Sequence, residues 1–240
     1  MEILAACHVH SAWSYDGSWS LEALASAFRS RGYRVLLMTE HDRGFSQARL
    51  DEYREACVRA SAPDMLVVPG IEYSDAANRV HVLVWGTGSF LGEGLPTGDL
   101  LDSVRAAEGV AVLAHPSRRD AWQCFDPRWA ERLLGIESWN RKCDGWAPSR
   151  TSPRLLDTAH VIPFAGLDFH NWRQFFPLAM ALDVSAPITV ASVVEALRSR
   201  RCDARAFGFP LTHGLFKTAR PVLGVAEHGR KRLAAIARMR

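Results

Sequence analysis

The sequence predicts an α/β fold in which a parallel sheet closes into a barrel. Short apolar runs alternate along the chain with segments of helical periodicity, which is typical of buried parallel strands joined by helices. Ionisable residues gather at the ends of these runs, and the active site of a barrel lies at the carboxyl ends of its strands. A length of 240 residues suits one domain of this kind. We therefore expect residues 1–240 to form a single domain.

The composition is that of an ordinary globular protein. Hydrophobic residues make up 48% of the chain, charged residues make up 23%, and the formal net charge is +3. Because this charge is small, we expect no stable nucleic-acid partner. The five cysteines are scattered without a C-x-x-C pair, and neither a basic leader nor a long apolar stretch opens the chain. These features predict reduced thiols, a cytoplasmic location and no membrane segment.

The first half of the chain carries strand and helix signals in alternation. An apolar run closes in the stretch that begins at Cys7, with His8 and His10 at the strand end, and Ser20 is placed to cap a helix with Leu21, Leu24 and Phe28 on one face. The elements predicted after it are a strand over 34–39, a helix to about residue 60, strands over 65–68 and 80–85, a helix over 99–108 and a strand over 110–114.

The second half continues this alternation. Apolar runs predict strands over 133–136 and 161–167, and a last amphipathic helix is expected near 190–200. Asp126 and Ser152 each precede a proline, as a helix N-cap does when proline occupies the first helical position. The basic run 230–240 has apolar residues at helical spacing, which predicts a surface helix without an assigned function.

Histidines and carboxylates stand close to most of the predicted strand ends. His8 and His10 share one face of an extended chain, so that both imidazoles can approach one metal ion. His81 is the exception, because it begins its strand and joins the others only if the 74–80 loop brings that end to the mouth. The whole set is His8, His10, Asp16, His41, Glu72, His81, His115, Asp168 and His170.

Metal ions explain why such a set would gather in one place. Packed together without cations, the carboxylates would repel one another and each imidazole would need its own hydrogen-bond partner. Nitrogen and oxygen ligands in this number are enough for two or three divalent ions, with one carboxylate bridging. The donor types suit zinc, manganese or iron.

The motifs that carry these residues resemble those of the PHP (polymerase and histidinol phosphatase) superfamily. They are His-x-His at 8–10, Ser-x-Asp-Gly at 14–17, Thr-x-His-Asp at 39–42, Gly-x-Glu at 70–72, His81, His-Pro at 115–116 and Asp-x-His at 168–170. The resemblance implies a distorted (β/α)7 barrel, up to three metal ions and hydrolysis of phosphoesters. Glu40 and Asp16 depart from the commoner family pattern, which has aspartate and, in some members, histidine at these positions.

The resemblance also implies which residues hold which ion. Glu72 would be the bridge between ions. The implied ligand sets are His8, His10, Glu72 and Asp168 for the first metal, Glu72, His81 and His115 for the second, and Asp16, His41 and His170 for the third.

These ligands lead to a mechanistic hypothesis, in which a metal-bridging hydroxide held beside Glu72 attacks phosphorus. Arg118 is the predicted phosphate clamp, because a guanidinium group matches two phosphate oxygens at once. Asp42 is predicted either to protonate the leaving oxygen or to orient a ligand imidazole. The segment 137–142 is predicted to line the substrate side of the mouth. The expected substrate is a small phosphorylated molecule or an oligonucleotide end.

Two other functions remain open at this point. The same hydroxide can attack the carbonyl group of an ester, amide or carbamate, and some relatives of the superfamily have this chemistry. A non-catalytic metal-binding module is the third reading, as in PHP domains fused to polymerases. The complete ligand set favours an enzyme over such a module, and a panel of aryl phosphates and aryl esters separates the two kinds of hydrolysis.

Overall fold

The computed structural model describes residues 1–149, 151–159, 161–212 and 221–232. Its strands are β1 (Glu2–Val9), β2 (Val35–Met38), β3 (Glu40–His41), β4 (Leu66–Val68), β5 (Gly70–Ser74), β6 (His81–Trp85), β7 (Val110–Leu113), β8 (Gly135–Asn140), β9 (Ile162–Gly166), β10 (Leu178–Asp183), β11 (Cys202–Ala206) and β12 (Phe209–Pro210).

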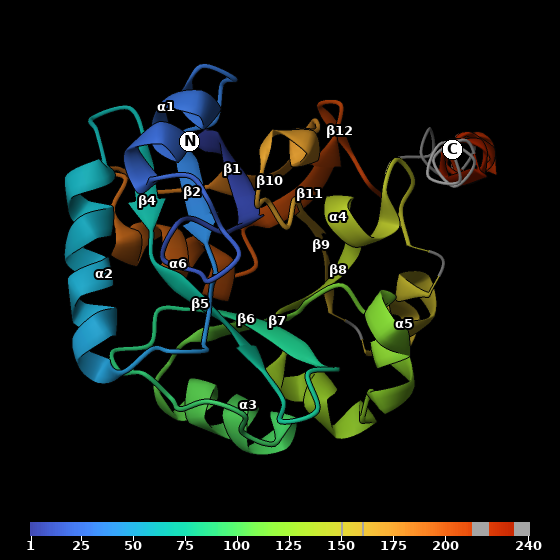
Figure 1. Ribbon diagram of the computed structural model, residues 1–240, viewed down its shortest axis with the longest axis horizontal. Helices are drawn as coiled ribbons and strands as arrows, with labels where there is room; N and C mark the ends of the chain where they lie inside the picture. The colour runs from blue at the N-terminus through green and yellow to red at the C-terminus, as the bar shows by residue number, and fades with distance from the viewer. Residues whose placement is uncertain (150, 160, 213–220, 233–240) are drawn as a thin grey trace.

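Helices lie around the outside of these strands (Figure 1). The α-helices are α1 (Leu21–Arg29), α2 (Gln47–Ala60), α3 (Thr97–Ala106), α4 (Arg141–Asp144), α5 (Ser152–Ala159) and α6 (Val190–Arg198), and residues 221–232 are also helical. Short 3-10 helices span Pro127–Arg132 and Trp172–Gln174, and 3-10 turns lie in Arg118–Cys124 on either side of a kink at Arg119 and Asp120. None of the described helices combines the length and the apolar character that crossing a membrane requires.

The strands form two mixed sheets. The first has the order β12-β11-β10-β1-β2-β4, and the second has the order β3-β5-β6-β7-β8-β9. β6 runs antiparallel to both β5 and β7, while β10 runs antiparallel to both β1 and β11. The predicted α/β class is confirmed, but the prediction of a wholly parallel sheet is wrong. The connection over 75–80 explains β6, because a parallel crossover needs about a dozen residues or more.

Two stretches of chain pass from the first sheet to the second. β2 pairs with β1 and β4, whereas β3, just beyond Thr39, pairs with β5. β4 and β5 are likewise separated only by Pro69. At Gly70 a Cβ would lie 2.4 Å from both the Met38 carbonyl oxygen and the Trp85 ring, and Trp85 Nε1 donates a 2.8 Å hydrogen bond to that carbonyl. Glycine is therefore the residue that fits this crossing.

The chain after β9 continues beside β1. The backbone N–H of Leu167 donates to the Cys7 carbonyl at 2.9 Å, and that of Phe169 donates to the His8 carbonyl at 3.0 Å. In return, the N–H of His10 donates to the Phe169 carbonyl at 2.9 Å. These bonds bring residues 168–170 next to the end of β1.

The helix ends agree with the sequence in part. The Ser20 side chain accepts from the Ala23 N–H, as predicted, and Asp126 caps a 3-10 helix through the N–H of Arg128. Ser152, however, is the first residue of α5, and its hydroxyl donates to the Glu137 carbonyl at 2.9 Å. The predicted N-cap role of Ser152 is wrong for this reason. The predicted terminal helix is described to residue 232, and 233–240 lie outside the described residues.

Replacing Gly70 with alanine is expected to lower the free energy of unfolding by about 2 kcal/mol, because the added methyl group overlaps Met38 and Trp85. Urea unfolding measures this difference. Gly88→Ala is the matched control, since a Cβ there meets nothing within 4 Å, and its expected change is under about 0.5 kcal/mol. Equal unfolding curves for the two variants would contradict the tight crossing.

Candidate metal centre

The nine residues predicted as metal ligands lie in one cluster that draws on both sheets. Ligand atoms within 4.8 Å of one another form three groups, which are His10, Asp16, His41 and His170; His8, Glu72 and His115; and His8, His10 and Asp168. His81 joins them through Glu72, because its Nδ1 lies 2.7 Å from Glu72 Oε1. The structure thus brings the whole predicted set together.

Glu72 occupies the middle of this cluster and is buried. Its Oε1 lies 2.7 Å from His81 Nδ1 and 2.9 Å from His115 Nε2. Its Oε2 faces three further nitrogens, which are His41 Nδ1 at 3.1 Å, His8 Nε2 at 3.4 Å and His10 Nε2 at 3.4 Å. The two oxygens of one carboxylate therefore serve two different sets of imidazoles, as a bridging ligand would.

The position of His81 follows from strand direction. Because β6 is antiparallel to β5, its first residue pairs with the last residue of β5, and Ser74 is the partner of His81. The start of β6 therefore lies at the same edge as the end of β5. This removes the difficulty that a parallel sheet created for His81.

The surroundings of His8 and His10 fit a divalent ion. In the described part of the chain, the Nε2 atoms of both residues are buried and have no hydrogen-bond partner. They lie 3.8 and 3.7 Å from Asp168 Oδ1, beyond hydrogen-bond length, and 3.4 Å from Glu72 Oε2. Ligands about 2.1 Å from one tetrahedral ion are about 3.4 Å apart. The separations suit a shared ion better than direct bonds between the side chains.

Hydrogen bonds from the opposite side of each ring orient these imidazoles. His8 Nδ1 lies 2.8 Å from Glu137 Oε1, and His10 Nδ1 lies 3.2 Å from Ser14 Oγ. The Ser14 hydroxyl in turn donates to Glu40 Oε2 at 2.5 Å. With the proton on Nδ1, each Nε2 presents its lone pair to the cluster, which is how metal-binding histidines are generally held.

Glu137 is an orienting residue that sequence reasoning missed. Its side chain is buried behind His8, so the predicted place of this residue at the substrate side of the mouth is wrong. Its Oε2 accepts from the His115 N–H at 2.7 Å and from Asn140 Nδ2 at 2.8 Å. A Cβ at Gly166 would lie 1.7 Å from Glu137 Oε1. A carboxylate at the end of a buried strand was the available signal.

Three of the predicted ligands adopt backbone conformations that are rare outside glycine. The φ angle is 62° at His8, 23° at His115 and 49° at Asp168. His8 lies at an irregularity in the pairing of β1 with β2, between Cys7 and Val9. The convergence of His8 and His10 therefore depends on a bulge, and the regular alternation predicted from the sequence does not describe it. Such strain is common where function fixes a side chain.

Charge in the cluster keeps its acids ionised. Burial alone would raise the pKa of Glu72, but the interactions with the surrounding imidazoles, those of His8 and His81 first, outweigh it and hold this pKa well below its usual range. Burial also tends to raise the pKa of Asp168. The interactions with His8 and Lys142 outweigh this tendency and hold the pKa of Asp168 below its usual range. For His10, burial and the nearby His41 lower the pKa, which favours the neutral form that binds metals.

The two residues predicted to act on the substrate lie at the edge of the cluster. Both carboxylate oxygens of Asp42 accept from Ser74, from its N–H at 3.1 Å and its hydroxyl at 3.2 Å, and burial raises the pKa of Asp42. Within the described residues, no hydrogen bond joins Asp42 to a histidine. Arg118 donates to the Asn78 carbonyl at 3.0 Å and lies 3.2 Å from His81 Nε2.

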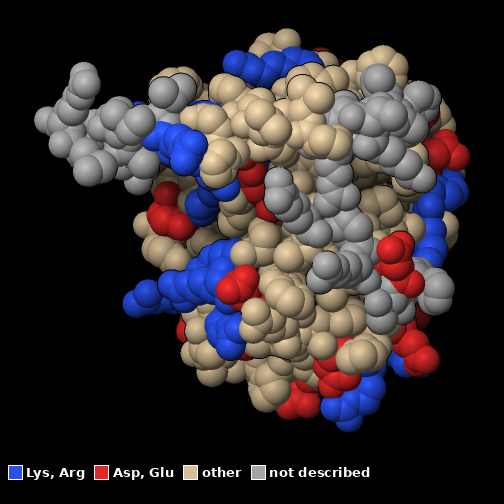
Figure 2. All heavy atoms as spheres, turned by 90° about the vertical axis from the view of Figure 1, so that its right-hand side faces the viewer, with Lys and Arg blue, Asp and Glu red and all other residues tan. Residues whose placement is uncertain are grey.

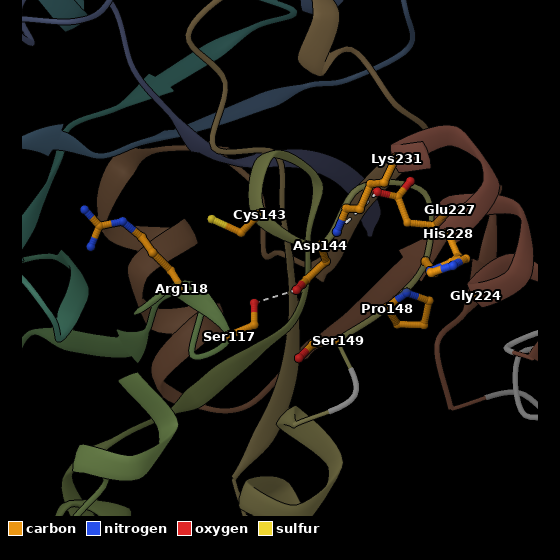
Figure 3. Close-up of a pocket in the computed structure, with 11 residues that line it drawn as sticks. Ser117, Arg118, Cys143, Asp144, Pro148, Ser149, Gly224, Glu227, His228 and Lys231 are labelled. Atoms are coloured by element: carbon orange, nitrogen blue, oxygen red, sulfur yellow. Dashed lines mark hydrogen bonds and ion pairs between the residues drawn. The ribbon is translucent and has the colours of Figure 1, made fainter. Parts of the chain in front are cut away.

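Two pockets lie in this region of the molecule. One, of about 430 Å³, is lined by Tyr15, His41, Asp42 and His81 among others. The other, of about 500 Å³, lies between the region after β7, the α4 segment and helix 221–232 (Figure 3). In this view Arg118 points away from the other lining side chains, and Ser117 donates to Asp144 at 2.6 Å. The first pocket reaches the cluster at His41 and His81, whereas none of the nine predicted ligands lines the second.

Comparisons with known proteins add evidence on the fold. No protein-family model and no curated protein matches the chain. Among solved structures, it is similar to a two-domain protein of Bacteroides vulgatus containing a predicted PHP-like metal-dependent phosphoesterase, with a TM-score of 0.67 and 16% identity. The match covers 86% of this chain and 65% of that one, so the chain spans less than two thirds of that protein.

Two further solved structures show the same similarity at low identity. PsfC from Pseudomonas syringae matches with a TM-score of 0.62 and 16% identity, over 97% of this chain and 99% of that one. An amidohydrolase from Chromobacterium violaceum matches with a TM-score of 0.54 and 15% identity, over 82% and 96% of the two chains. The chain thus has the fold of metal-dependent hydrolases. More narrowly, it shares the fold of the PHP-like phosphoesterases that its motifs resemble.

Glu137→Gln is expected to weaken metal binding about 10- to 100-fold, because an amide in this position no longer holds His8 and disturbs the bond from the His115 N–H. Titration of chelator-stripped protein with Mn²⁺ measures the affinity. Glu131→Gln, at an exposed position, is the control and should bind like the wild type. Unchanged affinity in Glu137→Gln would show that His8 needs no such support.

Asp144 gives the folded protein a pH dependence of stability. Burial raises its pKa from 3.8 to about 6, although hydrogen bonds from Asn140 and Ser117 oppose the rise. The folded carboxyl group holds a proton that the unfolded chain releases, so stability falls as the pH rises from about 4 to about 6. Across this window, wild type should lose about 2–3 kcal/mol relative to Asp144→Asn. Urea unfolding of both proteins at several pH values measures the difference, and a constant difference would contradict it.

Proposed function

We propose that this chain is a hydrolase that cleaves a phosphomonoester or a phosphodiester with two or three divalent ions of zinc, manganese or iron. The observation that carries the proposal is the pair of buried Nε2 atoms of His8 and His10, which lack hydrogen-bond partners in the described chain and face Glu72 and Asp168. The fold shared with PHP-like phosphoesterases supports the same reaction. The TIM-like (β/α)7 form of that fold is part of the proposal, as is a single domain over 1–240.

The residues on hand would hold the ions in three groups. The implied sets are His8, His10, Glu72 and Asp168; Glu72, His81 and His115; and Asp16, His41 and His170, and the distances around Glu72 agree with a bridge between ions. When bound, divalent ions supply positive charge for the phosphoryl oxygens and lower the pKa of water toward neutrality.

The chain's own groups orient and accompany this chemistry. Glu137 and Ser14 keep His8 and His10 turned toward the cluster. We assign Arg118 to the phosphoryl oxygens, because its guanidinium already lies at the edge of the cluster beside His81. We assign Asp42 to the leaving oxygen, because it lines the pocket that contains His41 and His81.

The surroundings of the site favour small substrates. The pocket of about 430 Å³ beside His41 and His81 suits a small phosphorylated molecule or an oligonucleotide end. On the face shown in Figure 2, basic and acidic side chains are interspersed among neutral ones, which is unlike a continuous nucleic-acid surface. A cytoplasmic protein without a stable nucleic-acid or membrane partner remains our expectation.

Hydrolysis of an ester, amide or carbamate is the second candidate. The fold similarity to an amidohydrolase favours it, and the same ions can polarise a carbonyl group. A panel of aryl phosphates, diaryl phosphates and aryl esters, assayed with Mn²⁺ or Zn²⁺, separates the two candidates. We expect preferential release from a phosphate, and preferential metal-dependent cleavage of the aryl ester would overturn the proposed function.

Glu72→Gln should lose bound metal and reduce phosphatase turnover at least about 100-fold, because the bridge between ion sites loses its charge. Elemental analysis of protein purified without chelator, together with phosphate release, measures both quantities. Glu55→Gln, on the exposed face of α2, is the control and should keep both. Turnover that survives in Glu72→Gln would refute the bridging role.

A further inference from the structure

Lys142 places a side-chain cation inside the predicted ligand set. Its Nζ lies 3.2 Å from Asp168 Oδ1 and 3.1 Å from His170 Nε2. His170 Nε2 is also 2.9 Å from Asp16 Oδ2, and His170 belongs to the group of ligand atoms with His10 and His41. The ammonium group therefore contacts one member of this group, His170, and also Asp168, which belongs to the neighbouring group with His8 and His10.

The fold holds Lys142 in this position. Lys142 lies in the first turn of α4, whose N-cap is Asn140, and the Asn140 side chain accepts from the Cys143 N–H at 2.9 Å. The same side chain donates to Glu137 Oε2 at 2.8 Å. Glu137, which orients His8, thus also holds the side chain of Asn140, the N-cap of the helix that carries Lys142.

An ammonium group and a divalent ion exclude each other here. Lysine only donates hydrogen bonds, so it takes an acceptor position on Asp168 Oδ1 that a metal would use, and it places its charge 3.3 and 3.1 Å from the two ring nitrogens of His170. An ammonium group and a divalent ion that share these partners also repel each other. The Lys142 side chain is 39% exposed, which leaves it a path toward solvent when an ion enters.

We propose that Lys142 competes with the divalent ion at the group formed by His10, Asp16, His41 and His170, so that this site fills last and most weakly. The inference rests on the metal centre of the proposed function but not on the reaction or its substrate. Lys142 is a positioning residue in this role, because it acts on metal occupancy. The ambient metal concentration then decides whether two or three ions are present.

Titration of chelator-stripped protein with Mn²⁺, following free Mn²⁺ by electron paramagnetic resonance, tests the proposal without any substrate. Lys142→Met removes the charge and keeps a similar chain length, and it should bind the weakest ion at least about tenfold more tightly than wild type. Lys142→Arg keeps the charge and should stay within about twofold of wild type. Lys231→Met is the matched control, because its Nζ pairs with Glu227 in the neighbouring pocket.

The outcomes separate this inference from the proposed function. If wild type binds two ions and Lys142→Met leaves the weakest affinity unchanged or adds no third ion, the competition is refuted while the metal centre stands. If no variant binds Mn²⁺ or Zn²⁺, the metal centre and the competition both fail. Tighter binding in Lys231→Met as well as in Lys142→Met would assign the effect to general surface charge and overturn the specific role of Lys142.

Discussion

The electrostatic demand of one buried carboxylate shapes this part of the molecule. Glu72 is surrounded by imidazoles on both of its oxygens, and a charge in such a place needs cations to compensate for the water it has lost. Several features of the fold outside Glu72 bring the surrounding imidazoles into place. Gly70 allows the chain to reach β5 past Met38 and Trp85, and the antiparallel turn into β6 brings His81 to the same edge.

The sequence predicted the composition of the site better than the architecture behind it. Acids and imidazoles at strand ends were enough to place Glu72, His115 and Asp168 together, because the ends of neighbouring strands meet at one edge. The direction of β6 was not apparent from its apolar run, since buried strands of either direction look alike. The short connection over 75–80 contained the missing information. Nothing in the local sequence indicated the positive φ angle at His8.

The orienting residues were harder to recognise than the ligands. Glu137 and Glu40 are buried acids that contact His8 and Ser14, and their roles depend on long-range packing. A carboxylate behind an imidazole differs from one in front of it only in three dimensions. The same holds for Gly166, whose lack of a side chain matters because Glu137 occupies that space. Ligand motifs can therefore be recognised in the sequence, whereas the residues that orient the ligands can be recognised only in the structure.

The position of the cluster across two sheets has a mechanical consequence. His8 belongs to β1 of the first sheet, whereas His41, Glu72 and His81 belong to strands of the second. An ion held by members of both groups would act as a cross-link that fastens the sheets at this seam. The metal concentration would then affect the stability of the fold as well as its chemistry. Loss of a ligand through mutation would weaken the contact between the two sheets.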